Sequence, residues 1–387
     1  MNYQAIQLIL AFYTIMHLDQ KVSLKALHTF GMEVEARYFV EAKTHSEVLT
    51  LLNYRHMIHM PILFLGGGSN VLFTSDFAGI VIRINSKGIV IREEDDTHVI
   101  VTAEAGENWD DFVQYCVHCG WAGLENLSLI PGTVGAAPIQ NIGAYGVEVK
   151  DLIEAVQVVE INSGKQKRYS AAECQFGYRD SIFKRSLKGK VIILNVTFKL
   201  DKANPPVSSS AGIPLLRLDY GDIRGELQRL GVADPTIVDV REAVCNIRRR
   251  KLPDPAQIGN AGSFFKNPVI SNDLLVSLQD RFPGMPFYPQ TSGRVPSPEQ
   301  NPNHNNLNPT DSSMNFDHAK IPAAWLIEQC GWKGYRDGDA GVHPGQPLVL
   351  VNYGTATGGQ ILELATRITD SVYQKFAIGL ETEVNII

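Results

Sequence analysis

The spacing of apolar residues along the chain predicts five amphipathic helices. Apolar side chains recur there every three or four positions, which is the period that places them on one face of a helix. Thr44 and Glu47 form a capping-box pattern at the start of the first helix, and Asn108 caps the second. The predicted helices lie at 45–59, 109–117, 236–251, 271–282 and 357–376.

Strand patterns are short, and several are joined by tight turns. The runs at 156–161 and 166–169 flank an Asn-Ser-Gly-Lys turn, which is typical of a hairpin. Strict alternation of apolar and polar residues over 194–200 predicts a half-buried strand. Helices mixed with mostly hairpin-connected strands favour an α+β fold over a doubly wound one. Further strands are predicted at 61–65, 80–84, 89–92, 98–104, 348–351 and 378–386.

Three stretches interrupt these patterns. Residues 1–22 form a predicted N-terminal extension; its apolar run is too short to span a bilayer and lacks the preceding Lys or Arg of a signal peptide. The segment 204–214 is rich in proline and serine, which predicts a domain boundary. The stretch 289–318 is rich in proline and asparagine and poor in apolar residues, so we expect a mobile insertion at 291–318.

Composition narrows the class of protein. The 387 residues suffice for two or three domains, and 44% hydrophobic and 20% charged residues exclude a wholly disordered, fibrous or membrane-embedded protein. The net charge of −6 argues against general nucleic-acid binding. Five scattered cysteines suit a reducing, cytoplasmic compartment. Cys116 and Cys119 lack the second ligand pair of a zinc site, so we expect no metal.

A glycine-rich segment follows the predicted strand at 61–65. Residues 66–70 read Gly-Gly-Gly-Ser-Asn, and glycines let backbone approach a ligand and offer N–H groups to a phosphate. This is not a dinucleotide fingerprint, because Val71 stands where the third glycine belongs, and it lacks the Lys-Ser/Thr pair of a P-loop. A tight turn without a ligand is the alternative.

A second segment, 130–146, contains four glycines and three alanines and no charged residue. Such a stretch is neither a good helix nor a good strand, and it suits backbone packed flat against a large ligand. Two such segments in one region favour a phosphate-bearing cofactor. Their spacing alone does not choose between NAD and FAD.

Six motifs carry a more specific signal. They are Gly-Gly-Gly-Ser-Asn at 66–70, Ile-Pro-Gly-Thr-Val-Gly at 130–135, Gln-Asn-Ile-Gly-Ala-Tyr-Gly at 140–146, Phe-Gly-Tyr-Arg-Asp-Ser at 176–181, Lys-Leu-Pro-Asp-Pro at 251–255 and Asn-Ala-Gly-Ser-Phe-Phe-Lys-Asn-Pro at 260–268. In this order they resemble the family of UDP-N-acetylenolpyruvoylglucosamine reductases. Phe-Tyr-Pro-Gln at 287–290 resembles the substrate-capping tyrosine loop of its type I members.

The resemblance implies an NADPH-dependent oxidoreductase with tightly bound FAD. The family reduces the enolpyruvyl ether of UDP-N-acetylglucosamine to the lactyl ether, which gives UDP-N-acetylmuramate for peptidoglycan synthesis, and it implies a cytoplasmic monomer. The implied fold is an FAD-binding domain of the vanillyl-alcohol-oxidase (PCMH) type, with two α+β subdomains, followed by an α+β substrate-binding domain. The implied boundaries are 23–203 with a core at 36–202, a linker at 204–214, a second domain at 215–376, and a C-terminal strand at 377–387 that returns to the active site.

Three residues match catalytic positions of the family. Arg179 matches the arginine that stabilises the enolate, Ser263 the serine that protonates C2, and Glu383 the C-terminal glutamate. Read without the resemblance, Arg179 is more typical of a structural ion pair and Ser263 of a turn. Spacing does not separate Glu383 from Glu381, and only the motif match selects Glu383.

The match also implies the binding residues. Lys251 would bind phosphates of the substrate or of NADPH, and Tyr288 would close over the UDP part. A solvated basic run at a helix C-terminus is the alternative for Arg248 and Lys251. The implied FAD contacts are Gly66, Gly67, Gly68, Ser69, Asn70, Pro131, Gly132, Gly135, Ala136, Pro138, Ile139, Asn141, Ile142 and Gly143. The implied substrate contacts are Tyr145, Tyr220, Arg248, Lys251, Asn267, Tyr288 and Gln346.

One departure lies near the C-terminus, where Asn385 replaces the arginine that the family has two residues after its catalytic glutamate. An amide carries no charge, so the contacts expected around Glu383 change. Two other functions compete: a flavin oxidase of the same superfamily that uses oxygen and an alcohol, and a catalytically silent nucleotide-binding protein. The matches at 260–268 and 380–384 argue against the first, and the three intact catalytic residue types argue against the second.

Overall fold

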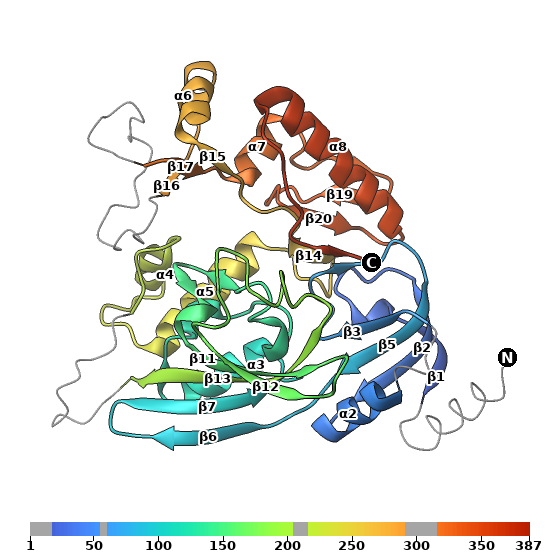
Figure 1. The fold of residues 1–387 in the computed structure, drawn as a ribbon. Coiled ribbons are helices and arrows are strands. Elements are labelled where there is room, and N and C mark those ends of the chain that lie inside the picture. The colour runs from blue at the N-terminus through green and yellow to red at the C-terminus, as the bar shows by residue number, and fades with distance from the viewer. Residues whose placement is uncertain (1–17, 55–59, 204–215, 291–315) are drawn as a thin grey trace. The chain divides into compact units, whose positions relative to one another are not determined.

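The computed structural model describes residues 18–54, 60–203, 216–290 and 316–387. The predictions for 1–17, for the helix end at 55–59, for the linker 204–214 and for 291–315 lie outside the described residues. The chain forms two compact units, shown with their elements in Figure 1. Unit 1 comprises residues 1–27, 34–69 and 76–249, and unit 2 comprises 28–33, 70–75 and 250–387. Two short segments, 28–33 and 70–75, therefore belong to unit 2. A division of the chain into consecutive domains would place them in the first domain.

The first sheet of unit 1 has the strand order β1–β2–β5–β3. The sheet joins β1 (Asp19–Ser23) antiparallel to β2 (Glu35–Ala42), whereas β2, β5 (Phe77–Ile84) and β3 (Ile62–Leu65) run parallel. Residues 19–22, assigned to the extension by the sequence, thus belong to a sheet. Helix α2 (His45–Tyr54) starts with the predicted capping box, in which Glu47 N–H donates to Thr44 Oγ1 and Thr44 N–H donates to the Glu47 carboxylate, both at 3.1 Å.

The second sheet of unit 1 is antiparallel and has the order β12–β11–β13–β7–β6, with β8 also paired to β13. Its strands are β6 (Ile89–Glu94), β7 (His98–Glu104), β8 (Trp121–Ala122), β11 (Ile153–Glu160), β12 (Gln166–Ser170) and β13 (Val191–Lys202). The predicted hairpin is confirmed as β11 and β12. The prediction of a half-buried strand over 194–200 is wrong, because β13 is a central strand and 194–198 are all buried. Its polar Thr197 is accommodated by a hydrogen bond to Thr102 Oγ1 at 3.0 Å.

Three helices of unit 1 lie between or after these strands. Helix α3 (Trp109–His118) begins at its predicted cap, where Asn108 Oδ1 accepts from Asp111 N–H at 3.1 Å, and it buries the predicted face. Helices α4 (Ile223–Arg229) and α5 (Ile237–Lys251) share a small apolar cluster. Short 3-10 turns are η1 (Lys25–Leu27), η3 (Glu125–Leu127), η4 (Val134–Ala136) and η5 (Val149–Asp151), and the two-residue strands β9 (Gly143–Ala144) and β10 (Val147–Glu148) form a hairpin.

The described residues of unit 2 form three small sheets and three helices. One sheet has the order β14 (Gly259–Ser263), β20 (Val349–Asn352), β19 (Ala340–Val342), β18 (Arg336–Asp337). A second has the order β15 (Val269–Ser271), β17 (His318–Lys320), β16 (Tyr288–Gln290), so both ends of the predicted insertion lie in strands. The helices are α6 (Asn272–Arg281), α7 (Ala323–Gln329) and α8 (Gly358–Phe376).

The C-terminal segment forms less strand than predicted. Of the stretch 378–386, only β21 (Asn385–Ile386) is a strand, and it pairs parallel with β4 (Val71–Leu72). Before it, Thr382 makes a single bridge with Phe265. The C-terminal segment therefore pairs first with Phe265 and then with β4, and it does not form one continuous strand.

Candidate active site

The two glycine-rich segments of unit 1 pack directly against each other. A Cβ atom added to Gly67 would lie 3.0 Å from Gly132 Cα, and one added to Gly132 would lie 2.9 Å from Ser69 Oγ. Ser69 also donates from its hydroxyl to the Pro131 carbonyl at 3.0 Å. These distances are shorter than almost all real Cβ contacts, so a side chain at either glycine would force the facing segment to shift, and glycine favours the close contact between the two segments. The resulting cradle of backbone exposes few side chains of its own.

The start of helix α3 holds the second segment in place. Trp109 N–H donates to the Gly132 carbonyl at 3.1 Å, and the Trp109 indole donates to the Leu127 carbonyl at 2.9 Å. Gly135 N–H donates to the Ala105 carbonyl at 2.9 Å, and a Cβ at Gly135 would lie 2.6 Å from that of Ala105. The first part of this segment is thus fixed by Trp109 at the start of α3 and by Ala105 just before that helix.

Arg179 lies against the end of the second segment. Its guanidinium donates to the Gly143 carbonyl at 2.6 Å and to the Asn141 carbonyl at 3.4 Å. The buried Asn141 in turn donates to the Gly177 carbonyl at 2.8 Å, so the turn carrying Arg179 and the predicted FAD contacts bind each other. Asn141 and Arg179 have φ of +45° and +52°. Non-glycine residues held in this left-handed region cluster at functional sites, where surrounding contacts enforce them.

The structure brings three predicted substrate contacts together in unit 1. Tyr145 packs on the α4/α5 cluster, and a Cβ at Gly221, next to Tyr220, would lie 2.9 Å from the Tyr145 ring. The Tyr145 group also contributes to the electrostatic environment of Arg248. Burial lowers the pKa of Arg248, and the neighbouring Tyr145, Cys245 and Asp110 groups oppose that effect.

Two supporting residues near the substrate contacts were not predicted. Asn126, a fully buried amide, donates to the Tyr145 carbonyl at 2.9 Å and to the Arg217 carbonyl at 2.8 Å, and so joins two loops. His343 Nδ1 accepts from Gln346 N–H at 3.1 Å in unit 2. No local sequence pattern marked Asn126, and the spacing of His343 and Gln346 was the only signal for His343.

Ser263 and Glu383 lie on neighbouring backbone segments of unit 2. Glu383 N–H donates to the carbonyl of Phe264, the residue after Ser263, at 2.8 Å. The register of β14 against β20 shifts between Asn260 and Ser263, and Gly262 has φ +69°, so a bulge leaves Ser263 exposed. A serine presented in this way is open to a substrate.

The structure separates the two candidate glutamates. The Glu381 carboxylate accepts from Lys266 Nζ at 2.8 Å, in an ion pair where its side chain is 76% exposed. Glu383 is partly buried, and the carbonyl of Glu383 accepts from the Asn70 amide at 3.2 Å. Glu381 is therefore committed to Lys266.

The remaining predicted substrate contacts of unit 2 lie at strand edges and turns. Asn267 Oδ1 accepts from Ala323 N–H at 2.9 Å at the start of α7. Tyr288 lies on the edge strand β16, with Lys320 Nζ 5.9 Å from the centre of its ring. Lys251 is the exposed last residue of α5.

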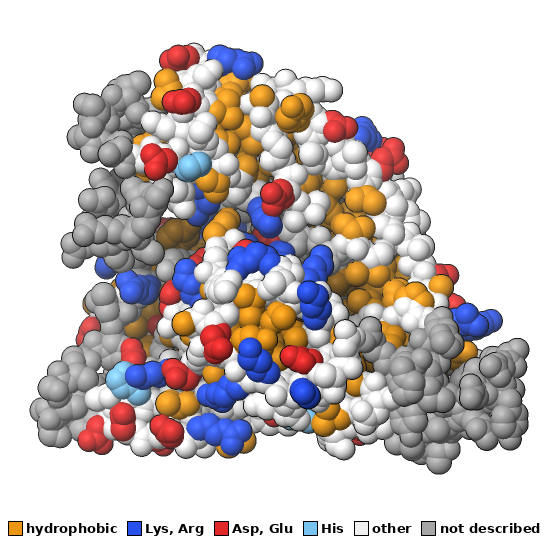
Figure 2. Space-filling view, in the orientation of Figure 1, with side chains coloured by type: hydrophobic (Ala, Val, Ile, Leu, Met, Phe, Trp, Pro, Cys, Tyr) orange, Lys and Arg blue, Asp and Glu red, His pale blue; other side chains and the backbone are white. Residues whose placement is uncertain are grey.

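Although the net charge of the chain is −6, positively charged side chains lie among the negatively charged ones on its surface (Figure 2). Figure 2 shows Lys and Arg side chains beside Asp and Glu side chains over unit 1 on the viewed face. A cavity of about 410 Å³ between α3 and α5 shows the same mixture, with Asp110, Glu242, Arg241 and Arg249 in its wall. None of the predicted site residues lines this cavity.

Comparisons with known proteins define first the class of the protein. Residues 36–170 match the model of an FAD binding domain, and residues 254–387 match the model of the UDP-N-acetylenolpyruvoylglucosamine reductase C-terminal domain. The α+β fold with an FAD-binding domain is therefore confirmed. The two segments expected to contact such a group present glycine at positions 67 and 132, where an added Cβ would crowd the facing segment.

Two relatives and one solved structure define the family. The chain is 47% identical over 372 residues to the UDP-N-acetylenolpyruvoylglucosamine reductase of Pseudomonas syringae pv. tomato, covering 96% of this chain and 99% of the relative. It is 46% identical to that of Chromobacterium violaceum, covering 95% and 98%. The crystal structure of the Thermus caldophilus reductase is 24% identical, covers 96% of this chain and 99% of its own, and has a TM-score of 0.59, which shows a similar fold. The chain belongs to the UDP-N-acetylenolpyruvoylglucosamine reductase family.

Proposed function

We propose that Arg179, Ser263 and Glu383 carry the chemistry of this reductase and that the segments 66–70 and 130–143 hold its FAD. The chain is an FAD-dependent oxidoreductase of peptidoglycan precursor synthesis that reduces UDP-N-acetylenolpyruvoylglucosamine, with NADPH as the reductant. The product is UDP-N-acetylmuramate. The assignment of roles to individual residues rests on the motif match together with the geometry of each unit.

The segments 66–70 and 130–143 would hold FAD, which would supply the hydride-transfer chemistry between NADPH and C3 of the enolpyruvyl group. Negative charge then develops at C2 and on the adjoining carboxylate, where a preorganised cation stabilises it most. The Arg179 guanidinium suits this role because two carbonyl oxygens already fix its plane. Little reorganisation is then needed when charge develops.

Ser263 supplies the proton that completes the product at C2. Its exposure on the bulge of β14 gives a substrate access to the hydroxyl, and the buried Asn260 fixes the bulge by accepting from Gly262 N–H at 3.0 Å. A hydroxyl is a weak acid, so it depends on its surroundings for activation. Glu383 is the carboxylate that we assign to this end of the site, since Glu381 is paired with Lys266.

Substrate and NADPH both carry phosphates, which we assign to Arg248 and Lys251 on helix α5. Tyr145, Tyr220, Asn267 and Gln346 complete the predicted substrate contacts. Tyr288 acts as a lid, and its position on an edge strand beside Lys320 supports that role.

We also propose that the enzyme works as a monomer in the cytoplasm. All five cysteines are free thiols, which suits a reducing compartment. Among the described residues, no helix is both long enough and apolar enough to cross a bilayer.

The observation that carries the residue assignment is the direct packing of the two glycine-rich segments, with Arg179 bound to the end of the second. Purified protein should be yellow, release FAD on denaturation, and oxidise more than one equivalent of NADPH per flavin only when the enolpyruvyl substrate is added. A colourless protein without releasable flavin, or continuous NADPH oxidation that is independent of the substrate, would contradict the proposal.

A further inference from the structure

Arg248 is a partly buried cation whose hydrogen bonding is incomplete. Its Nε atom is shielded from solvent and has no hydrogen-bond partner among the residues that the structure describes. Arginine keeps its proton at neutral pH, so this charge persists despite the burial that lowers its pKa. A buried donor without an acceptor is costly, and an anionic ligand oxygen relieves that cost.

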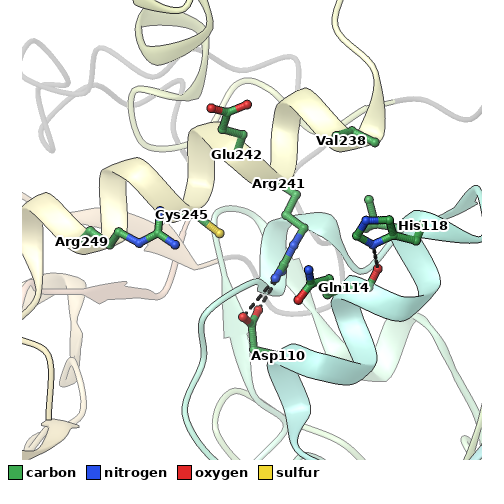
Figure 3. A pocket seen from close by; sticks show the side chains of 9 residues that line it. Asp110, Gln114, His118, Val238, Arg241, Glu242, Cys245 and Arg249 are labelled. Carbon is green, nitrogen blue, oxygen red and sulfur yellow. Dashed lines mark hydrogen bonds and ion pairs between the residues drawn. The ribbon is translucent and has the colours of Figure 1, made fainter. Parts of the chain in front are cut away.

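Asp110 is a carboxylate whose charge raises the pKa of Arg248, and the charge of Arg248 in turn lowers the pKa of Asp110. Asp110 is paired with Arg241, which donates from its two terminal nitrogens at 2.7 and 3.0 Å. Figure 3 shows Arg241 reaching from α5 to Asp110 at the start of α3. The two side chains are 14% and 21% exposed, so solvent screens this bidentate pair only partly.

Asp110 also holds the segment that precedes the FAD contacts. Leu129 N–H donates to Asp110 Oδ1 at 2.6 Å, and Leu129 has a φ of +56°. Burial raises the pKa of Asp110, but the hydrogen bonds from Arg241 and Leu129 outweigh burial and keep that pKa below its ordinary value. The carboxylate is therefore charged and its oxygens are occupied.

We propose that Arg241 is a positioning residue that keeps Asp110 away from Arg248, so that Arg248 stays uncompensated for the diphosphate of a ligand. This inference rests on the proposed function, in which Arg248 binds phosphate. Arg241 itself touches no ligand. It acts by occupying the one carboxylate whose charge reaches Arg248 among the described residues, and by fixing α5 to the segment at Leu129.

The alternative is that the Asp110–Arg241 pair only braces α3 against α5. The two roles predict opposite results when both partners are removed. If Arg241 holds Asp110 away from Arg248, Arg241→Met releases a carboxylate that competes with the ligand, and adding Asp110→Asn removes the competitor. If the pair is only a brace, the double variant binds ligand no better than Arg241→Met.

The test measures dissociation constants without turnover, from the change in flavin absorbance on adding UDP-N-acetylglucosamine or, separately, NADP⁺ to the FAD-loaded protein. The two probes show whether Arg248 serves the nucleotide sugar, the nicotinamide cofactor or both. We expect Arg241→Met to weaken binding of at least one probe by about tenfold, and the Asp110→Asn/Arg241→Met double variant to return within about threefold of wild type. Arg241→Lys, which keeps the charge, should stay within about threefold.

Arg249→Met is the matched control, because it removes one positive charge from the same helix and the same cavity wall. It should change binding less than twofold. A double variant as weak as Arg241→Met, or an equal loss in Arg249→Met, would overturn the inference. If Arg241→Met fails to retain FAD, Arg241→Gln replaces it and the same ranking decides. Failure of wild-type protein to bind either probe would instead contradict the proposed function.

Discussion

Asn385 donates two hydrogen bonds to one carbonyl oxygen of Asn70, from its backbone N–H at 3.1 Å and from its side-chain amide at 3.0 Å. Asn70 returns a bond from its own amide to the Glu383 carbonyl at 3.2 Å. Three hydrogen bonds thus join Asn70 to the C-terminal segment that contains Glu383, and both belong to unit 2. Asn385 stands where the resemblance to the family expects an arginine, and it carries no charge. We call the three hydrogen bonds among Asn385, Asn70 and Glu383 the backbone clamp.

Removing this clamp should loosen the backbone of Glu383. Asn385→Ala loses one of the three bonds, so we expect a loss of about 0.5–1 kcal/mol in the free energy of unfolding and a lower kcat. Asn385→Asp places a carboxylate against the Asn70 carbonyl and should lower kcat further. Chemical denaturation and steady-state assays measure both effects. Wild-type kcat in both variants would show that the clamp has no catalytic consequence.

Ser263→Ala should separate the two half-reactions. Flavin reduction by NADPH should keep its wild-type rate, whereas reduction of the enolpyruvyl substrate should slow by about 10²–10⁴-fold, the usual contribution of a positioned proton donor. Stopped-flow absorbance follows each half-reaction. Ser271→Ala is the matched control, since Ser271 caps α6 by accepting from Leu274 N–H and should cost about 1 kcal/mol of stability without changing either rate. Equal slowing of both half-reactions in Ser263→Ala would rule out the proton-donor role.

The two glutamates of the C-terminal segment should differ sharply. Glu381→Gln loses only an exposed ion pair with Lys266, so its kcat should stay within about twofold of wild type. Glu383→Gln should reduce kcat by at least about a hundredfold with an unchanged thermal midpoint. Steady-state kinetics on both variants, each loaded with FAD, decides the assignment. The reverse ranking would move the catalytic role to Glu381.

Glycine at position 67 should be required for FAD retention. The added methyl of Gly67→Ala meets the backbone of Gly132 at 3.0 Å, so the two segments must separate, at a cost of about 1–3 kcal/mol. Gly164→Ala is the control, because Gly164 has φ +66° with open space around it and its substitution strains only a hairpin turn. Bound FAD per chain should fall in the first variant and stay at the wild-type value in the second. Full flavin content in Gly67→Ala would contradict the cradle.

Stability should depend on the protonation of His45. Its ring nitrogen lies 2.7 Å from the Glu104 carboxylate, and this hydrogen bond raises the pKa of His45 above 6.5 in the folded state. A raised folded-state pKa stabilises fully below pH 6.5, and the stabilisation is lost as the pH rises through the folded-state value. The free energy of unfolding, measured in urea at several pH values across this range, should fall as the pH rises. His45→Gln should reduce the slope of that dependence on pH. Identical slopes in the two proteins would exclude the pair as its source.

Local sequence patterns predicted an element well where the signal for it lies within the element itself. Helix α8 (Gly358–Phe376) agrees with the predicted helix at 357–376, because the period of its apolar residues lies within the helix itself. Strand β13 was predicted as a strand but not as a doubly buried one, since its burial depends on β11 and β7 beside it. The C-terminal strand was predicted too long because its partner β4 has only two residues.

In the candidate site, too, local motifs could be recognised from the sequence, whereas contacts between residues far apart in the sequence could not. The glycine-rich segments and Arg179 were predicted from motifs, and their residues form one bonded group in unit 1. The pairing of Asp110 with Arg241 joins residues 131 positions apart, so no local pattern could reveal it. The choice of Glu383 over Glu381 came from the motif match alone, and no local pattern could reveal the ion pair of Glu381 with Lys266, 115 positions away.

A single-turnover experiment without oxygen tests the central claim most directly. FAD-loaded protein is first reduced with one equivalent of NADPH and then mixed with UDP-N-acetylenolpyruvoylglucosamine, while the oxidised-flavin absorbance is recorded. We predict that this absorbance returns fully in the absence of oxygen and that one equivalent of UDP-N-acetylmuramate forms. Flavin that stays reduced until oxygen is admitted would contradict the reductase and would favour an oxidase of the same superfamily.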